Sequence, residues 1–113
     1  MTDKMTFGTL SASDRTAKAL SNPRASFLNE TAVITTARGE KDGPPPVHFA
    51  RTVGMINAAF GHILKRPLTT GEWAQIMILD KVARHQNVPI KDNLQDIAGY
   101  AACAFECSLE SST

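Results

Sequence analysis

Two stretches near the carboxyl terminus decide the fold: Asp80-Lys81-Val82-Ala83-Arg84 and, after a short turn, Asp92-Asn93-Leu94-Gln95-Asp96-Ile97-Ala98-Gly99-Tyr100. Pro89 lies between them and ends the first helix, because proline cannot continue a helix. We expect an antiparallel helical hairpin, in which cations at the end of one helix meet carboxylates at the start of the next. This arrangement is typical either of a structural ion-pair clasp or of a phosphate and metal site.

Two further helices are predicted before this hairpin. The first begins at Asn22-Pro23, a cap residue followed by proline at the first helical position, and ends near Arg38-Gly39. Residues 39–46 contain two glycines and three prolines and are expected to form a loop. The second helix runs from about Val47 to Lys65, with apolar residues at spacings of three and four, and Pro67 follows it.

Capping boxes predict where the two helices of the hairpin begin. Thr69 and Glu72 form one such pair, and Asp92 and Gln95 form a second pair that opens a helix reaching about Leu109. Four helices with short connections predict an all-α, four-helix bundle-like single domain over residues 22–110. Residues 1–21 hold few large apolar side chains, so we expect a poorly ordered or strap-like N-terminal arm.

Composition limits the classes of function. The chain has 113 residues and a net charge of +1, which argues against nonspecific binding to nucleic acid or membranes. No apolar run approaches the ~18 residues that cross a bilayer, and the N-terminus has no secretory signal. Cys103 and Cys107 lie in one helical segment and are expected to be reduced thiols. We therefore expect a cytoplasmic protein.

The two hairpin helices carry apolar residues on more than one side. The predicted core stripe consists of Leu94, Ile97, Ala98, Ala101, Phe105 and Leu109 on the last helix and of Ile76, Leu79, Val82 and Ala83 on the helix before it. On the last helix the opposite side is not charged as a solvated face would be, since it carries Asp96 with Tyr100, Cys103 and Cys107. On the helix before it, another side is lined by Trp73, Met77, Asp80 and Arg84. A helix that is apolar nearly all round is normally buried on both sides. We expect a homo-oligomer with these helices at its centre; the alternative is that the N-terminal arm covers the second side.

The candidate ligand site consists of Lys81, Arg84, Asp92, Asp96 and Tyr100. The two cations suit phosphate oxygens, and the arginine suits them in bidentate fashion. Asp92 and Asp96 are four residues apart on one helix face, a spacing at which two carboxylates can hold one Mg²⁺ while leaving waters in place. Tyr100, one turn further on, suits stacking on a base or a hydrogen bond to a sugar.

Each of these residues also has a structural interpretation. Asp92 fits a helix N-cap, Asp96 and Arg84 fit an interhelical ion pair, and Tyr100 fits a core or interface aromatic. No catalytic residue is predicted, because the sequence has no P-loop, no nucleophile elbow, no zinc-ligand spacing and no paired histidines. The chain needs no cofactor for a binding role.

Three sequence elements carry a resemblance that extends from Thr31 to about Glu106. They are Arg38-Gly39-Glu40, Leu68-Thr69 through Lys81-x-x-Arg84, and Asp92-Asn93-x-x-Asp96-x-x-Gly99-Tyr100. In this order they resemble a family of small uncharacterised phage and prophage proteins, which implies a host-cell cytoplasmic location. The chain departs from that family at Asp42-Gly43, where its members carry Tyr-Gly.

More remotely, the pattern is similar to the all-α (MazG-type) NTP pyrophosphohydrolases. That resemblance implies a helical bundle that dimerises or tetramerises and binds nucleotide phosphates through acidic residues, sometimes via Mg²⁺. Those enzymes need an E-x-x-E cluster on one helix and E-x-x-D on the next to position water. Here the first helix has only Glu30, the second has no acid, and the third has Glu72 and Asp80.

Three functions follow from these observations. The first is nucleotide binding without catalysis, sequestering a nucleotide or a cyclic-nucleotide signal of host defence. The second is a Mg²⁺-dependent nucleotide pyrophosphohydrolase that uses Asp92, Asp96, Asp80 and Glu72. The third is a protein-binding inhibitor module, whose apolar helix faces contact a partner protein. We favour the first, because the hydrolytic acids are missing.

Overall fold

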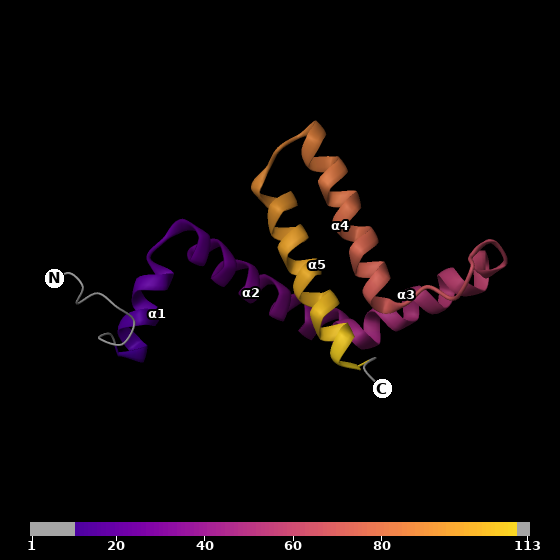
Figure 1. Ribbon diagram of the computed structural model, residues 1–113, viewed down its shortest axis with the longest axis horizontal. Coiled ribbons are helices and arrows are strands. Elements are labelled where there is room, and N and C mark those ends of the chain that lie inside the picture. Colours follow the sequence, from indigo (N-terminus) through magenta and orange to yellow (C-terminus); the bar gives the residue numbers. More distant parts are fainter. Residues whose placement is uncertain (1–10, 111–113) are drawn as a thin grey trace.

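The computed structural model describes residues 11–110, which form helices joined by short connections (Figure 1). The elements are α1 (Ala12–Leu20), α2 (Pro23–Asp42), α3 (Pro45–Phe60), a 3₁₀ helix (Gly61–Ile63), α4 (Thr70–Asn87) and α5 (Lys91–Glu110). The predicted all-α class is confirmed. In the predicted N-terminal arm, residues 1–10 lie outside the described residues, and α1 follows them. Among the described helices, none has the length and apolarity needed to cross a membrane.

The α4–α5 hairpin is the centre of the molecule, because these two antiparallel helices form the most extensive helix pair (Figure 1). α2 lies across α5, and α3 contacts both helices of the hairpin. The first half of α2 and the end of α3 project to either side, which gives extents of 64 × 39 × 28 Å. Helices that project in this way bury less surface than helices lying parallel in a closed bundle.

Helix α2 begins where the sequence predicts but ends later than predicted. The start is confirmed, because Asn22 Oδ1 accepts a hydrogen bond from the Ala25 amide at 2.8 Å and Pro23 occupies the first turn. The predicted end near Arg38-Gly39 is wrong, since α2 continues to Asp42. A glycine inside a helix costs only ~1 kcal/mol. The stronger stop is Gly43, whose φ of 97° favours glycine and which three prolines follow.

The connection from α3 to α4 is held by side chains. Helix α3 ends at Phe60 rather than at the predicted Lys65. Asn57 fastens the returning chain, because its Nδ2 donates to the Leu68 carbonyl at 3.1 Å and its Oδ1 accepts from the Leu68 amide at 2.8 Å. The predicted capping box of Thr69 and Glu72 is confirmed, with reciprocal bonds of 3.1 and 3.0 Å.

The second predicted capping box is wrong. Helix α5 begins at Lys91, so Asp92 lies inside its first turn and is exposed. The turn is fastened instead by the buried Asn93, whose Nδ2 donates to the Val88 carbonyl at 3.0 Å. Gln95 reaches away from the cap and donates to Glu30 Oε1 on α2 at 2.6 Å. Asp92 still suits its position, because a negative charge in the first turn interacts favourably with the helix dipole.

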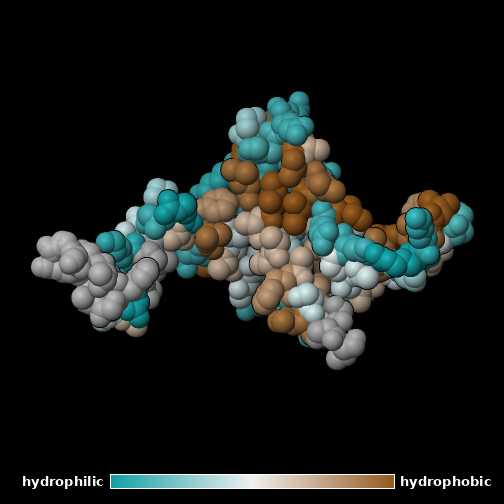
Figure 2. Space-filling model, viewed as in Figure 1, coloured by the Kyte–Doolittle hydropathy of each residue, from teal (hydrophilic) through white to brown (hydrophobic). Residues whose placement is uncertain are grey.

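The core is small and uses the side of the hairpin opposite to the predicted stripe. Phe49, Ala74 and Cys107 are buried together, with Trp73 and Tyr100 among the residues at their edge. Most large residues of the predicted core stripe are exposed instead, and Ile97 is half-buried; the exposed ones are Ile76, Leu79, Val82, Leu94, Phe105 and Leu109. Figure 2 shows hydrophobic surface gathered over the hairpin. The prediction of a core on that side is therefore wrong for the single chain, because α2 and α3 pack on the other side of the hairpin.

Gly99 permits the close crossing of α2 and α5. A Cβ built at this buried glycine would lie 3.1 Å from Thr35 Cγ2 on α2. The Thr35 hydroxyl donates to backbone carbonyls of its own helix at 3.1 Å, which holds that methyl group in place. A methyl group at position 99 therefore crowds Thr35, which has to shift by a few tenths of an ångström to admit it.

We expect Gly99→Ala to lower the free energy of unfolding by ~1 kcal/mol, because crowding against Thr35 outweighs the better helix propensity of alanine. In a Thr35→Ser background the methyl group is gone, and the same substitution is expected to be neutral or stabilising. Urea unfolding at one protein concentration measures both. Gly54→Ala, on an exposed stretch of α3 with nothing within 4 Å, is the control and should stabilise by ~0.5–1 kcal/mol. An equal effect of Gly99→Ala in both backgrounds would contradict this explanation.

The capping box also predicts a pH dependence. Arg66 binds the Glu72 carboxylate through both terminal nitrogens at 2.9 and 2.6 Å, and this contact, with the Thr69 amide, lowers the pKa of Glu72 from 4.5 to about 2. The folded pKa is below the unfolded one, so the stabilisation is present above pH 4.5 and is lost as the pH falls toward 2. Carboxyl-carbon NMR should give a Glu72 midpoint near pH 2.

The variant Arg66→Gln should move that midpoint toward 4.5, because Arg66 is the largest cause of the shift. It should also weaken the loss of stability between pH 4.5 and pH 2. A wild-type midpoint already near 4.5 would show that the arginine contact does not form in solution.

Candidate functional site

The predicted meeting of α4 and α5 forms around Asp96. Lys81 Nζ lies 3.3 Å from Asp96 Oδ2, and the two side chains are only 17% and 19% exposed. Tyr100, one turn further along α5, is half-buried beside them. Three of the five predicted site residues therefore lie together. A carboxylate this shielded from water needs a paired cation, so the contact is first of all structural.

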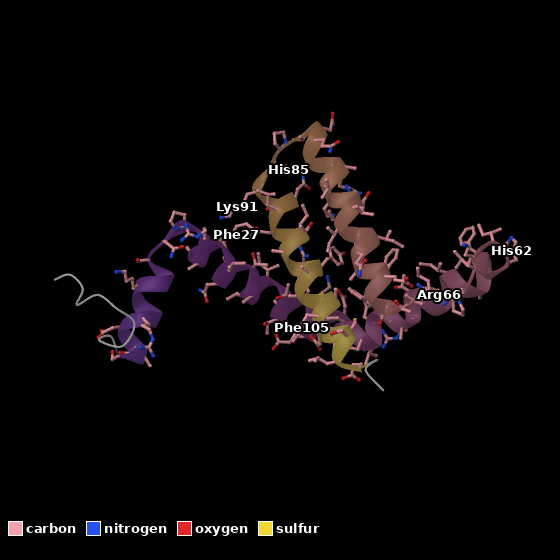
Figure 3. The ribbon with its side chains drawn as sticks, in the orientation of Figure 1. Phe27, His62, Arg66, His85, Lys91 and Phe105 are labelled. Carbon is pink, nitrogen blue, oxygen red and sulfur yellow. The ribbon has the colours of Figure 1, made fainter. Side chains whose placement is uncertain are left out.

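Arg84 and Asp92 lie elsewhere. Arg84 Nε contacts Asp80 Oδ2 at 2.9 Å, one turn back on α4 itself, and both side chains are exposed. The predicted interhelical ion pair of Arg84 with Asp96 is therefore wrong. Asp92 sits at the exposed start of α5, near the Lys91–Glu30 ion pair of 2.7 Å at the tip of the hairpin (Figure 3).

The second cation on Asp96 is Arg38 of α2, which the sequence-based site did not include. Arg38 Nη1 lies 3.2 Å from Asp96 Oδ1, so each carboxylate oxygen has its own cation. The Arg38 side chain is 59% exposed and can be reached from solvent. Arg38 belongs to the Arg-Gly-Glu element of the family resemblance, and that element is the sequence feature from which its place in the site could be predicted. Its partner depends on how α2 crosses α5, which local sequence does not specify.

A pocket of about 110 Å³ lies between α2, α3 and α5 beside this ion-pair cluster. Its polar lining includes Arg38 and Asp42 at the end of α2, His48 on α3 and Asp96 on α5. Asp42 and His48 were also missed by sequence reasoning. Both flank the Gly-Pro-Pro-Pro segment, which was interpreted only as a loop, and the tight turn at Gly43 places them at one opening.

Aromatic rings form the inner wall of the pocket. Phe49 and Tyr100 stack with ring centroids 6.2 Å apart and an interplanar angle of 30°, and His48 lies 5.7 Å from Phe49. Burial, followed by the nearby Asp96 carboxylate, raises the pKa of the Tyr100 phenol. Tyr100 therefore stays neutral at physiological pH, where it can donate a hydrogen bond.

A groove of about 310 Å³ continues from the pocket along α2 and α5. Its charged lining residues are Glu40 and Glu106, with no cation. Cys103 borders both spaces, and burial raises the pKa of its thiol, with Cys107 and Glu106 adding to the shift. A thiol of this kind is a weak nucleophile, so Cys103 acts here as an apolar wall.

The predicted Mg²⁺ ligands Asp92 and Asp96 differ in their surroundings. Asp96 already holds Lys81 and Arg38, whereas Asp92 faces solvent in the first turn. Within residues 11–110 there is no group of three His, Cys, Asp or Glu side chains placed to hold a metal ion. Mg²⁺ binding at these two residues stays a prediction.

Comparison with curated proteins and with solved structures gives no match to the chain. A family model matches residues 27–108, a range that contains α3, α4 and every charged residue of the pocket. The chain therefore belongs to the family described as Domain of unknown function (DUF6378).

Proposed function

We propose that the protein binds a nucleotide, or a similar ligand that joins a planar ring to a phosphate, without transforming it. The observation that carries this proposal is the pocket in which the Arg38 guanidinium and the Phe49–Tyr100 ring pair line one opening. Concave sites with apolar walls and a few converging polar groups are the usual form of small-molecule sites.

The size of the pocket suits one ring of the ligand. A cavity of ~150 Å³ is known to accept a molecule of benzene, and this pocket measures about 110 Å³ and is open to solvent. Tyr100 and His48, which are only partly buried, offer ring surface to a base, with which offset or tilted contacts are favourable, and the buried Phe49 supports the Tyr100 ring from behind. Asp42 and Asp96 accept hydrogen bonds, so they suit the N–H groups of a base or the hydroxyl groups of a sugar.

Charge determines where the phosphate lies. The adjoining groove is lined by Glu40 and Glu106 without a cation. The pocket lining, by contrast, includes the cation Arg38 beside Asp42 and Asp96, so Arg38 is the group that suits the phosphate. Its guanidinium carries five N–H donors, and the contact with Asp96 is made through Nη1. When Arg38 turns toward a ligand, Asp96 keeps Lys81 as its counter-charge. Binding therefore leaves no buried carboxylate unpaired.

The positions of the acids favour binding over hydrolysis. Glu72 lies at the start of α4 and Asp92 at the start of α5, which are opposite ends of an antiparallel hairpin. Asp80 pairs with Arg84 on the surface. The four carboxylates of the pyrophosphohydrolase alternative therefore do not converge on one metal-bound water, which that reaction requires.

In its narrower form the proposal is sequestration of a nucleotide or a cyclic-nucleotide defence signal, in the host cytoplasm if the protein is phage-encoded. This form rests on the resemblance to phage proteins described from the sequence. The second candidate is a protein-binding inhibitor module, and the exposed apolar residues of α4 and α5 favour it. That candidate requires an isolated chain that is monomeric and that binds no nucleotide.

Calorimetric titration with mononucleotides and cyclic dinucleotides, with and without Mg²⁺, tests the proposal. For any ligand that binds, Arg38→Gln is expected to weaken binding about 10–100-fold, the value of a charge-assisted hydrogen bond or pair of bonds. Arg84→Gln is the matched control: its side chain is 64% exposed and ion-paired, like that of Arg38, but lies outside the pocket lining. It should bind like the wild type.

Two results would contradict the proposal. One is the absence of binding to any of these ligands at high micromolar concentration. The other is an equal loss of affinity in the Arg38→Gln and Arg84→Gln variants, which would mean that net charge rather than this pocket governs binding.

A further inference from the structure

The outward side of the hairpin carries large apolar side chains in a regular pattern. We define the outer face as Ile76, Leu79, Val82 and Ala83 of α4 with Leu94, Ala98, Ala101 and Phe105 of α5. Its five large side chains are between 38% and 68% exposed, and Phe105 projects from the C-terminal half of α5 (Figure 3). Ile76, Leu79 and Ala83, like Leu94, Ala98, Ala101 and Phe105, follow the alternating spacing of three and four that packs one helix against another.

Along α4 from Ile76 to Ala83 and along α5 from Leu94 to Phe105, the charged residues are Asp80, Lys81 and Asp96, and the last two are largely shielded from solvent in their own ion pair. The neighbouring charges of α4, Asp80 and Arg84, pair with each other at one side of the stripe. Depletion of charge with retention of Leu, Ile and Phe is typical of the centre of an interface between identical chains. Exposed apolar residues also lie elsewhere, such as Phe60 and Ile63 near the end of α3, but those two lie beside His62 and Lys65.

Bulky and small residues alternate across the outer face. The contact between Lys81 and Asp96 sets the level of one helix against the other, so Leu79 lies at about the level of Ala98. By the same alignment Ala83 lies close to the level of Leu94. Leu79 and Leu94 therefore each stand beside an alanine of the other helix, and Ile76 lies at about the level of Ala101. Ridges of one such surface fit the grooves of an identical surface turned by a two-fold axis.

We propose that a second copy of this chain covers the outer face, with the two-fold axis parallel to the hairpin. This axis sets α4 of one copy on α5 of the other at the same level, so that Leu79 of each copy packs over Ala98 and Ala101 of its partner. The product is a four-helix bundle made of two hairpins. The proposal is independent of the ligand, whose pocket lies between α2, α3 and α5.

The areas involved support this partner. The single chain buries few apolar residues in residues 11–110, namely Phe49, Val53, Ala74 and Cys107, a small core for a domain of this length. The exposed side chains of the outer face present on the order of several hundred Å² of surface, comparable with the ~800 Å² that each partner contributes to a standard interface. A second copy would bury these exposed apolar side chains, because a two-fold axis brings the same surface of both copies together.

Sedimentation equilibrium tests the proposal. The wild type is expected to be a dimer at micromolar concentration, and Leu79→Glu is expected to weaken dimerisation at least about tenfold, because it buries an unpaired charge. Val33→Glu is the matched control, since Val33 is 64% exposed on α2, away from the outer face. It should remain dimeric. A monomeric wild type, or equal dissociation of both variants, would overturn the proposal.

Disulfide trapping gives a second test that does not depend on a charged substitution. A Leu79→Cys chain and an Ala98→Cys chain, both carrying Cys103→Ser, are mixed and oxidised. A covalent heterodimer is expected, whereas Val33→Cys mixed with Ala98→Cys should give none. Failure of the Leu79→Cys and Ala98→Cys chains to cross-link, with circular dichroism showing intact helices, would exclude the proposed register.

Discussion

The placement of α2, α4 and α5 depends on the carboxylate of Asp96. Its two oxygens are held by Lys81 of α4 and Arg38 of α2, so one side chain ties three helices together. Removing this carboxylate would leave the shielded Lys81 ammonium without a partner, and an unpaired shielded charge is costly. The pocket depends on the same contact, because Arg38 and Asp96 both line it.

Local chemistry predicts the helices whose ends are fixed by unambiguous caps. Asn22-Pro23 and Thr69–Glu72 act as their sequence predicts, because each bond is made within three residues. Asp92 also has a capping residue type, but the turn before it is fastened by Asn93, which reaches back to Val88. Which of the adjacent residues Asp92 and Asn93 fastens the turn depends on the direction from which the chain enters α5. Contacts between helices set that direction, and local sequence does not.

The core and the site show what periodicity does not specify. A hydrophobic stripe marks the larger residues of the hairpin, yet its own contributions to the interior include Ala74, Gly99 and Cys107, because helices that cross closely favour small side chains at the crossing. The larger residues then remain outside. Arg38, Asp42 and His48 reach the pocket through the same crossing, so no pattern within a single helix could have joined them to Tyr100.

Helix α5 separates the two proposed surfaces. Its Asp96, Gly99 and Tyr100 face α2 and the pocket, whereas Leu94, Ala101 and Phe105 face outward. A substitution on either side therefore leaves the contacts of the other side in place, unless it displaces the helix as a whole. If both proposals hold, this separation lets pocket variants affect the proposed ligand binding and outer-face variants affect the proposed assembly without each mimicking the other. An effect of Arg38 on assembly, or of Leu79 on ligand affinity, would require movement of α5 itself.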